Sequence, residues 1–137
     1  MSEGVPGGAP EVGTLPRVSV RAVRGAVQVD VDEREEVLAR TRDLVSEVIR
    51  ANELSLDDFI SVIFTSTADL VSEFPAVAAR ELGMGDVPLM CARELEIERS
   101  MPRVIRLMAH VETPLTRAQV KHVYLNGAQA LRRDIAQ

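Results

Sequence analysis

Arginines in apolar surroundings are the side chains of this sequence that most suggest chemistry. Arg106 lies in the apolar run VIRLMAHV, Arg24 lies in VRAVRGAV, and Arg132 follows Leu131 near the C-terminus. A guanidinium does not lose its proton when it is buried, so each of these groups requires an anion. No acidic residue lies within two positions of Arg24 or Arg106. Because the planar fork of Arg binds a carboxylate through two hydrogen bonds, a convergent set would form a pocket for a small molecule with two carboxylates.

Each of these arginines also has a purely structural interpretation. A guanidinium on a long side chain can extend to solvent, or it can pair with an acid that is distant in the sequence. For any single arginine the sequence leaves both interpretations open. Three such arginines in one small chain favour a ligand site.

Three other side chains are weaker candidates. Glu94, in CAREL, can accept a hydrogen bond from a ligand hydroxyl or form a surface ion pair with a nearby arginine. Tyr124, the only tyrosine, lies in the apolar segment HVYL and is either a core residue or a donor to a ligand. Cys91 lacks the context of a nucleophile, and one cysteine with His110 and His122 makes no zinc signature. We therefore predict no metal.

Composition excludes several classes of function. The 137 residues fit one domain, and 46% hydrophobic with 27% charged residues is a globular balance. The net charge of −5 disfavours a nucleic-acid partner. A single cysteine, no signal peptide and no long apolar run predict a soluble cytoplasmic protein without a membrane partner. No Gly-rich phosphate loop, GxSxG or CxxC occurs, so the chemistry is expected to need no cofactor.

The elements that must position these residues begin after a tail. Residues 1–17 hold four of the eight glycines and three of the seven prolines, which predicts a flexible N-terminal tail before a domain of residues 18–137. VSVRAVRGAVQV predicts a first strand that meets a turn near Gly25. Asp32 and Glu35 fit a capping box, and apolar residues then recur at helical spacing up to about Ala51.

The rest of the chain alternates between strands and short helices. FISVIFTST predicts a buried strand, and Pro75 suits the first turn of a helix that ends at Gly83. VPLMCAREL and PRVIRLMAHVET predict two strands, Thr116 can begin a short helix TRAQVKH, and HVYL predicts a last strand. The expected fold class is α+β, with one mixed β-sheet and helices packed on one face. A subunit interface is a common cover for the other face.

The sequence resembles the monofunctional AroH-class chorismate mutases in the segments VRAVRGA, FTSTADLVSEFPAVAARELG, VPLMCARELEIE, PRVIRLMAHVET and HVYLNGAQALRRDI. The likeness spans residues 18–135, in the same order and with similar spacing. It implies the conversion of chorismate to prephenate in the synthesis of phenylalanine and tyrosine. It also implies a Bacillus chorismate mutase-like fold and a homotrimer that looks like a pseudo α/β barrel, with active sites between neighbouring subunits.

The resemblance also implies a set of site residues. Arg106 would contact the ether oxygen and a carboxylate, while Arg24 and Tyr124 would hold the carboxylate end of the substrate. Glu94 and the main chain of Cys91 would hold the ring hydroxyl. The catalytic side chains would be Arg106, Arg24, Glu94 and Tyr124. These four would also bind substrate, together with Phe74, Arg80, Cys91, Leu131 and Arg132.

Arg80 and Arg132 resemble positions at the mouth of the family's site. The sequence departs from some relatives at Val77, where they carry a lysine, and at Met90, where they carry a threonine. These departures concern the charge of the rim and the shape of the pocket.

Two other functions remain open at the level of the sequence. A small trimeric imine deaminase would also grip a carboxylate with an arginine at a subunit interface, but it predicts one key arginine rather than a cluster with Glu94 and Tyr124. A module that senses an aromatic metabolite, or binds an acidic partner, would use the arginines without turnover. Decay of chorismate absorbance with prephenate as product separates the mutase from both.

Overall fold

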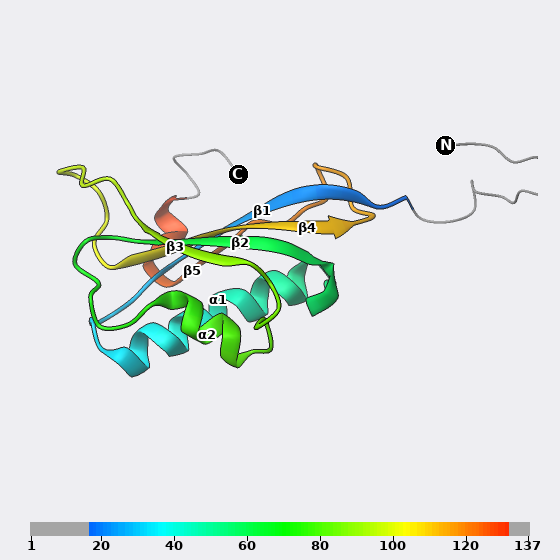
Figure 1. Ribbon diagram of the computed structural model, residues 1–137. Helices are drawn as coiled ribbons and strands as arrows, with labels where there is room; N and C mark the ends of the chain where they lie inside the picture. The colour runs from blue at the N-terminus through cyan, green and yellow to red at the C-terminus, as the bar shows by residue number, and fades with distance from the viewer. Residues whose placement is uncertain (1–16, 132–137) are drawn as a thin grey trace, which may run out of the picture.

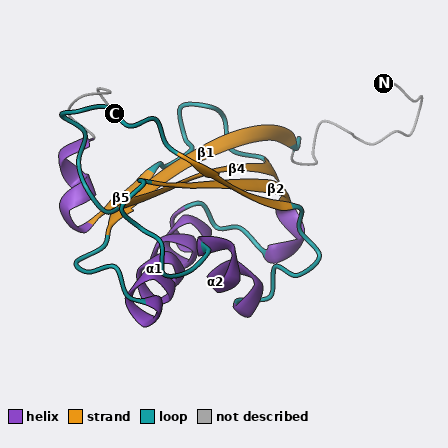
Figure 2. Cartoon of the chain, turned by 60° about the vertical axis from the view of Figure 1, so that its left-hand side comes forward, coloured by secondary structure: helices purple, strands orange, loops and turns teal. Residues whose placement is uncertain are grey.

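A five-stranded sheet carries two helices on one of its faces (Figures 1 and 2). This computed structural model describes residues 17–131, so the predicted tail lies almost wholly outside the described residues. The elements in chain order are β1 (Ser19–Gln28), α1 (Arg34–Ala51), the 3-10 helix η2 (Leu56–Asp58), β2 (Phe59–Ser66), α2 (Pro75–Glu81), β3 (Leu89–Arg93), β4 (Val104–Thr113), β5 (Val123–Leu125) and the 3-10 helix η3 (Asn126–Ala130).

The sheet is mixed, and its strands run in the order β3-β2-β4-β1-β5. The central strand β4 pairs antiparallel with both β1 and β2. The short strands β3 and β5 complete the edges, each parallel to its neighbour. The prediction of an α+β fold with one mixed sheet and helices on one face is confirmed.

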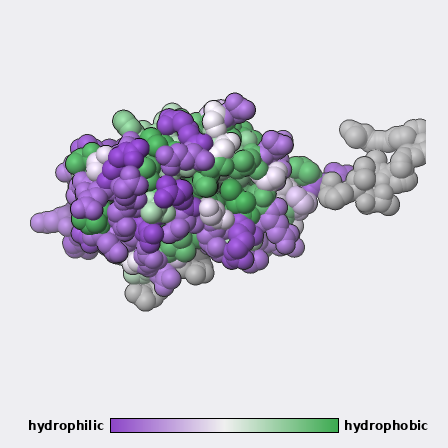
Figure 3. All heavy atoms as spheres, turned by 90° about the horizontal axis from the view of Figure 1, so that it is seen from below, coloured by the Kyte–Doolittle hydropathy of each residue, from purple (hydrophilic) through white to green (hydrophobic). Residues whose placement is uncertain are grey.

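Alternation along the strands separates the two faces of the sheet. In β4, Ile105, Leu107, Ala109 and Val111 are buried and face the helices. They join a core in which α1 contributes Val37, Leu44, Val45 and Val48, as its predicted apolar spacing requires. Charged and polar side chains cover much of the helix-bearing side of the molecule, which Figure 3 views from below.

Gly25 does not form a turn, contrary to the sequence prediction. The strand β1 continues through it to Gln28, and Gly25 is buried. A Cβ atom at this position would lie 3.0 Å from Cδ1 of Leu44 and 3.3 Å from the carbonyl oxygen of Val123. The residue is therefore a glycine because α1 and β5 pack closely against the strand.

The predicted capping box at the start of α1 is also wrong. The residue that precedes the helix is Glu33, and it makes no side-chain capping hydrogen bond. The carboxylate of Asp32 instead accepts the main-chain N–H groups of Val71 and Ser72, at 3.1 to 3.2 Å. Asp32 thus fastens a distant loop instead of its own helix.

The predicted helix at Pro75 is confirmed, whereas the predicted helix at Thr116 is wrong. Helix α2 begins at Pro75 as predicted, and Gly83 follows it with a φ of 108°, the left-handed conformation expected of a glycine there. The short helix predicted from Thr116 is absent, and the chain forms only a turn, in which the N–H groups of Gln119 and Val120 bond to the carbonyl of Thr116. The sequence also did not predict η3 after the last strand.

The face of the sheet opposite the helices exposes a row of apolar side chains. Met90 on β3, Ile63 on β2 and Met108 on β4 are neighbours in register, and they are 61%, 37% and 39% exposed. Figure 1 shows both helices on the other side of the sheet. Over residues 17–131, no helix has the length and apolar character needed to cross a membrane.

Candidate active site

Arg106 and Glu94 form an ion pair on the open face of the sheet. Nε of Arg106 lies 2.8 Å from Oε2 of Glu94, and the two side chains are 42% and 15% exposed. The same carboxylate oxygen accepts a hydrogen bond of 2.6 Å from the hydroxyl of Thr65. Because this bond and the ion pair converge on one oxygen, Thr65 and Arg106 fix the position of Glu94 between them.

The register of the sheet explains why these side chains meet. Thr65 on β2, Arg106 on β4, Ala26 on β1 and Tyr124 on β5 are successive cross-strand partners, so they share one face. Glu94 directly follows β3, where its N–H bonds to the carbonyl of Ser66. The alanine between Arg106 and Tyr124 is buried under Tyr124, Val104 and Ala128.

Arg24 belongs to the same face. It lies two positions before Ala26 on β1, opposite Met108, which makes it a diagonal neighbour of Arg106 at about 7–8 Å between Cα atoms. Its side chain is half-buried, and within residues 17–131 no acid pairs with its guanidinium. The structure therefore brings together Arg24, Arg106, Glu94 and Tyr124.

Tyr124 and Leu131 pack at the edge of this group. Tyr124 is 6% exposed and forms a small apolar cluster with Ala26, Val104 and Ala128, against which Leu131 packs. The helical turn η3, which contacts β1, leads directly to Leu131. Arg132, the predicted residue that follows, lies outside the described residues.

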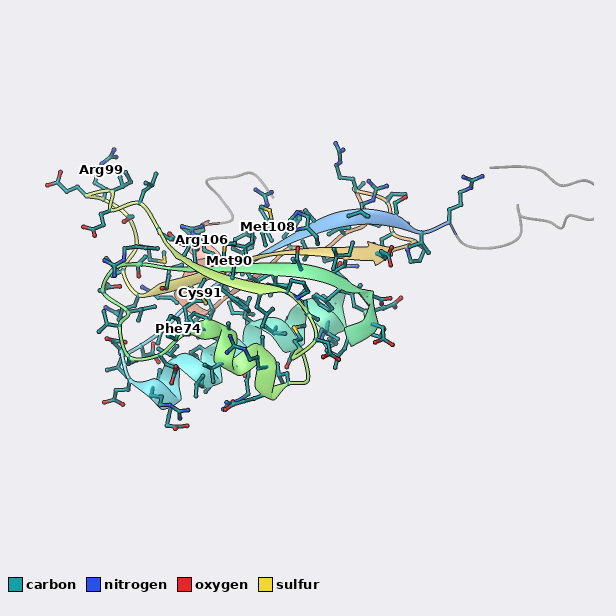
Figure 4. All side chains as sticks on the ribbon, in the orientation of Figure 1. Phe74, Met90, Cys91, Arg99, Arg106 and Met108 are labelled. Atoms are coloured by element: carbon teal, nitrogen blue, oxygen red, sulfur yellow. The ribbon has the colours of Figure 1, made fainter. Side chains whose placement is uncertain are left out.

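Phe74 and Cys91 lie at a second place, a cavity of about 430 Å³. Most of the described residues that line it are apolar, Leu70 and Ala92 among them, and Arg93 is the one cation and Glu73 the one acid in that set. Phe74 is 67% exposed at the start of α2. Figure 4 shows Phe74 toward the helices, whereas Arg106 and Met108 lie on the other side of the sheet.

Two acids hold the loop that presents Phe74. Glu73 accepts the N–H of Phe74 at 3.0 Å and pairs with Arg34 at 2.8 Å. The main-chain hydrogen bond from Phe74, and after it the Arg34 guanidinium, lower the pKa of Glu73 below its ordinary value despite partial burial. Burial works to raise the pKa of Asp32, but hydrogen bonds from Ser72 and Val71 outweigh it and lower that pKa.

The remaining predicted residue, Arg80, is exposed on α2. The structure thus divides the predicted residues into the group around Arg106, the cavity with Phe74 and Cys91, and Arg80. No group of three or more His, Cys, Asp or Glu within residues 17–131 could hold a metal ion.

Two residues that contact this site, Thr65 and His122, were not predicted from the sequence as site residues. Thr65 was counted only as part of a strand, although its hydroxyl bonds to Glu94. His122 was considered only as a metal ligand, although its Nδ1 accepts the main-chain N–H of Arg24 at 2.9 Å. Alternation along FISVIFTST places Thr65 on the same face as Ile63, which was the one available signal.

Comparison with known proteins gives consistent matches. The sequence profile of the family described as chorismate mutase type I matches residues 20–135. A chorismate mutase AroH from Thermus thermophilus is 45% identical over 117 residues, which cover 85% of this chain and 96% of that protein. A chorismate mutase AroH from Bacillus subtilis is 36% identical over 118 residues, with 85% and 93% covered.

A solved structure agrees with these sequence matches. The chorismate mutase from Clostridium thermocellum superposes with a TM-score of 0.79 at 44% identity, covering 80% of this chain and 98% of that one. At this identity the likeness extends beyond the fold to the sequence. The comparisons favour a mutase over the imine deaminase and the sensing module that the sequence left open.

Proposed function

The chain belongs to the chorismate mutase type I family, and from this premise we propose how its own residues carry out the reaction. The protein is a chorismate mutase, an isomerase that converts chorismate to prephenate. Its place is in the synthesis of the aromatic amino acids. The reaction is a unimolecular Claisen rearrangement, in which one C–O bond breaks while one C–C bond forms.

The barrier to this rearrangement falls when the protein does two things. It selects the compact conformer of chorismate in which the reacting carbons are close, and it places fixed positive charge where the ether oxygen gains electron density. We assign that charge to Arg106. What supports the assignment is that its guanidinium is anchored through Nε by Glu94, so that the two Nη amino groups can be aimed at a ligand.

Arg24 and Tyr124 are proposed to hold the carboxylate end of the substrate. Both lie on the same face as Arg106, and the guanidinium of Arg24 has no acid partner within the described residues. Glu94 is proposed to accept the hydroxyl of the ring, together with the main chain of Cys91. The carboxylate of Glu94 has a second oxygen, Oε1, that none of the hydrogen bonds described above uses.

We further propose that the active site is shared between subunits of a homotrimer. Arg24 and Arg106 carry two positive charges and Glu94 one negative charge, which leaves a net charge of only +1 for a substrate with two carboxylates. A further cation must therefore come from outside this group. Arg80 and Arg132 are the candidates, and Arg80 lies exposed on α2.

The separation of the Arg106 group from the cavity with Phe74 and Cys91 also supports an active site shared between subunits. In one chain the cavity with Phe74 and Cys91 does not include Arg24, Arg106 or Tyr124. A neighbouring copy that covers the open face could bring its own cavity to these residues and would also bury the apolar row Met90, Ile63 and Met108. A cytoplasmic location remains a proposal.

The observation that carries the proposed mechanism is the convergence of Arg106, Glu94 and Thr65 on one face with Arg24. The test is the decay of chorismate absorbance with purified protein, with prephenate identified as the product. A full set of single variants at Arg24, Arg106 and Glu94 should each reduce turnover while the fold is retained. Turnover that is unchanged in all three would refute the assigned site.

A further inference from the structure

His122 makes a hydrogen bond between two parts of the proposed site. Its Nδ1 accepts the main-chain N–H of Arg24 over 2.9 Å, although the two residues are 98 positions apart in the sequence. The ring is half-buried and lies directly before β5, two positions before Tyr124. The imidazole therefore connects the segment that carries Arg24 to the segment that carries Tyr124.

The register of β1 and β5 shows why a side chain is needed at this point. The parallel pairing of these strands begins with Gly25 opposite Val123, so Arg24 lies one residue outside it. The N–H of Arg24 is directed to the β5 side, where no strand is present to receive it. An unpaired main-chain N–H in a half-buried position is unfavourable, and His122 supplies the missing acceptor.

This role requires the neutral ring. Nδ1 accepts a hydrogen bond only while it carries no proton, so the proton of the ring must be on Nε2. Burial, and after it the positive charge of Arg24, lower the pKa of His122 below its ordinary value of 6.5. His122 also lines a cavity of about 620 Å³, and the other charged or titratable residues among its described lining are Glu47, Arg50, Arg117, Lys121 and Tyr124.

We propose that His122 is a positioning residue for the mutase reaction, which fixes the main chain of Arg24 and thereby aims its guanidinium relative to Tyr124. The inference rests on the proposed role of Arg24 in binding a substrate carboxylate. Protonation of the imidazole would turn the acceptor into a donor that faces another donor, and it would place a second positive charge beside Arg24. The junction of β1 with β5 then opens, and Arg24 loses its aim.

Two substitutions separate positioning from general support of the fold. In His122→Asn, the amide oxygen can take the place of Nδ1, whereas His122→Leu fills similar space without an acceptor. We expect His122→Leu to lower kcat/KM by about tenfold and His122→Asn to retain most of it at pH 7.5. Equal losses in the two variants, in proportion to their loss of thermal stability, would overturn the proposal.

The pH profile supplies a second measurement. In the wild type, kcat/KM should fall on the acid side as His122 takes up a proton, at a pH below 6.5. The asparagine variant does not titrate in this range, so its kcat/KM should stay level over the same interval. An identical acid limb in the wild type and in His122→Asn would show that another group is responsible and would overturn the proposal.

A double-variant cycle distinguishes failure of this inference from failure of the proposed site. If Arg24 binds the substrate, Arg24→Ala alone must lower kcat/KM strongly. If His122 acts through Arg24, His122→Leu must then cost little more in the Arg24→Ala background. A harmless Arg24→Ala would refute the proposed role of Arg24, whereas a strong loss in Arg24→Ala with an undiminished further loss from His122→Leu would refute only the role of His122.

Discussion

Nε of Arg106 lies 2.8 Å from Oε2 of Glu94, so the cation that we assign to the transition state is held by an acid of its own chain. An arginine free to move would have to be ordered when the substrate binds, at a cost in conformational entropy. Anchored at one nitrogen, the guanidinium is already oriented, and its charge needs little reorganisation during the reaction. The ion pair therefore orients the guanidinium of Arg106 and also neutralises part of its charge.

Replacement of Arg106 by citrulline tests whether charge or shape matters. Citrulline is nearly isosteric with arginine but neutral, so binding of the substrate is retained in part while stabilisation of the ether oxygen is lost. We expect kcat to fall at least about a hundredfold, because a lost electrostatic donor typically costs about 2.7–4 kcal/mol, which is a factor of about 10² to 10³. Turnover is measured by chorismate absorbance, and light scattering checks that the assembly is unchanged. Turnover near that of the wild type would rule out the electrostatic account.

Thr65 provides a matched pair of variants beside the same carboxylate. Thr65→Val removes the hydroxyl that donates to Glu94 at 2.6 Å and keeps the shape of the side chain, whereas Thr65→Ser keeps the hydroxyl. Because Glu94 would lose one of its two anchors, we expect Thr65→Val to lower kcat/KM by about tenfold and Thr65→Ser to lower it much less. Both variants should unfold at similar denaturant concentrations, since Thr65 is only half-buried. Equal activities in the two variants would contradict this role.

The sequence predicted the sheet and both helices because these follow from local patterns. Alternation in PRVIRLMAHVET and helical spacing between Val37 and Val48 report directly which side of each element is buried. The same patterns placed Arg24 and Arg106 within strands. For Glu94 the sequence allowed either a hydrogen bond to a ligand or an ion pair with a nearby arginine. The structure contains the ion pair, with Arg106.

Local patterns did not predict contacts that close over long separations. The hydrogen bonds of Thr65 with Glu94 and of Arg24 with His122 join residues 29 and 98 positions apart, and they depend on the pairing of the strands. The capping box at Asp32 failed for the same reason, because its carboxylate finds better donors 39 and 40 positions away. Gly25 was taken for a turn because its tight packing against Leu44 is a tertiary feature.

The apolar row Met90, Ile63 and Met108 on the open face predicts that copies of the protein associate through this face. Ile63 lies between Met90 and Met108 on the side of the sheet opposite α1 and α2. A charge at its centre would be costly to bury in an interface, so Ile63→Glu should shift the protein toward monomers, while Ile63→Val should not. Sedimentation or light scattering reads the oligomer, and the far-ultraviolet circular dichroism of both variants checks the fold. A monomeric wild type would contradict the shared active site.

Asp32 predicts a dependence of stability on pH. Its carboxylate accepts the N–H groups of Val71 and Ser72, and its pKa in the folded chain is lower than the ordinary 3.8. A carboxylate with a lowered pKa stabilises the fold fully above its unfolded pKa, and this contribution is lost as the pH falls through the folded pKa. Asp32→Asn should therefore unfold at a lower urea concentration than the wild type at pH 7, and the difference should shrink at pH values below about 3.8.

The same contact predicts an effect on the site, because Asp32 fastens the loop that leads to Phe74. Asp32→Ala removes both acceptors, so it should lower activity as well as stability. Glu35→Ala should change little, because Glu35 makes no cap and its ion pair with Arg34 is exposed to solvent. Urea unfolding at pH 7 and pH 3, with chorismate turnover at pH 7, measures both effects. The two variants could instead lose the same stability as each other, with the same loss at pH 7 and at pH 3. That result would mean that Asp32 stabilises the protein by capping the helix and not through its contact with the loop.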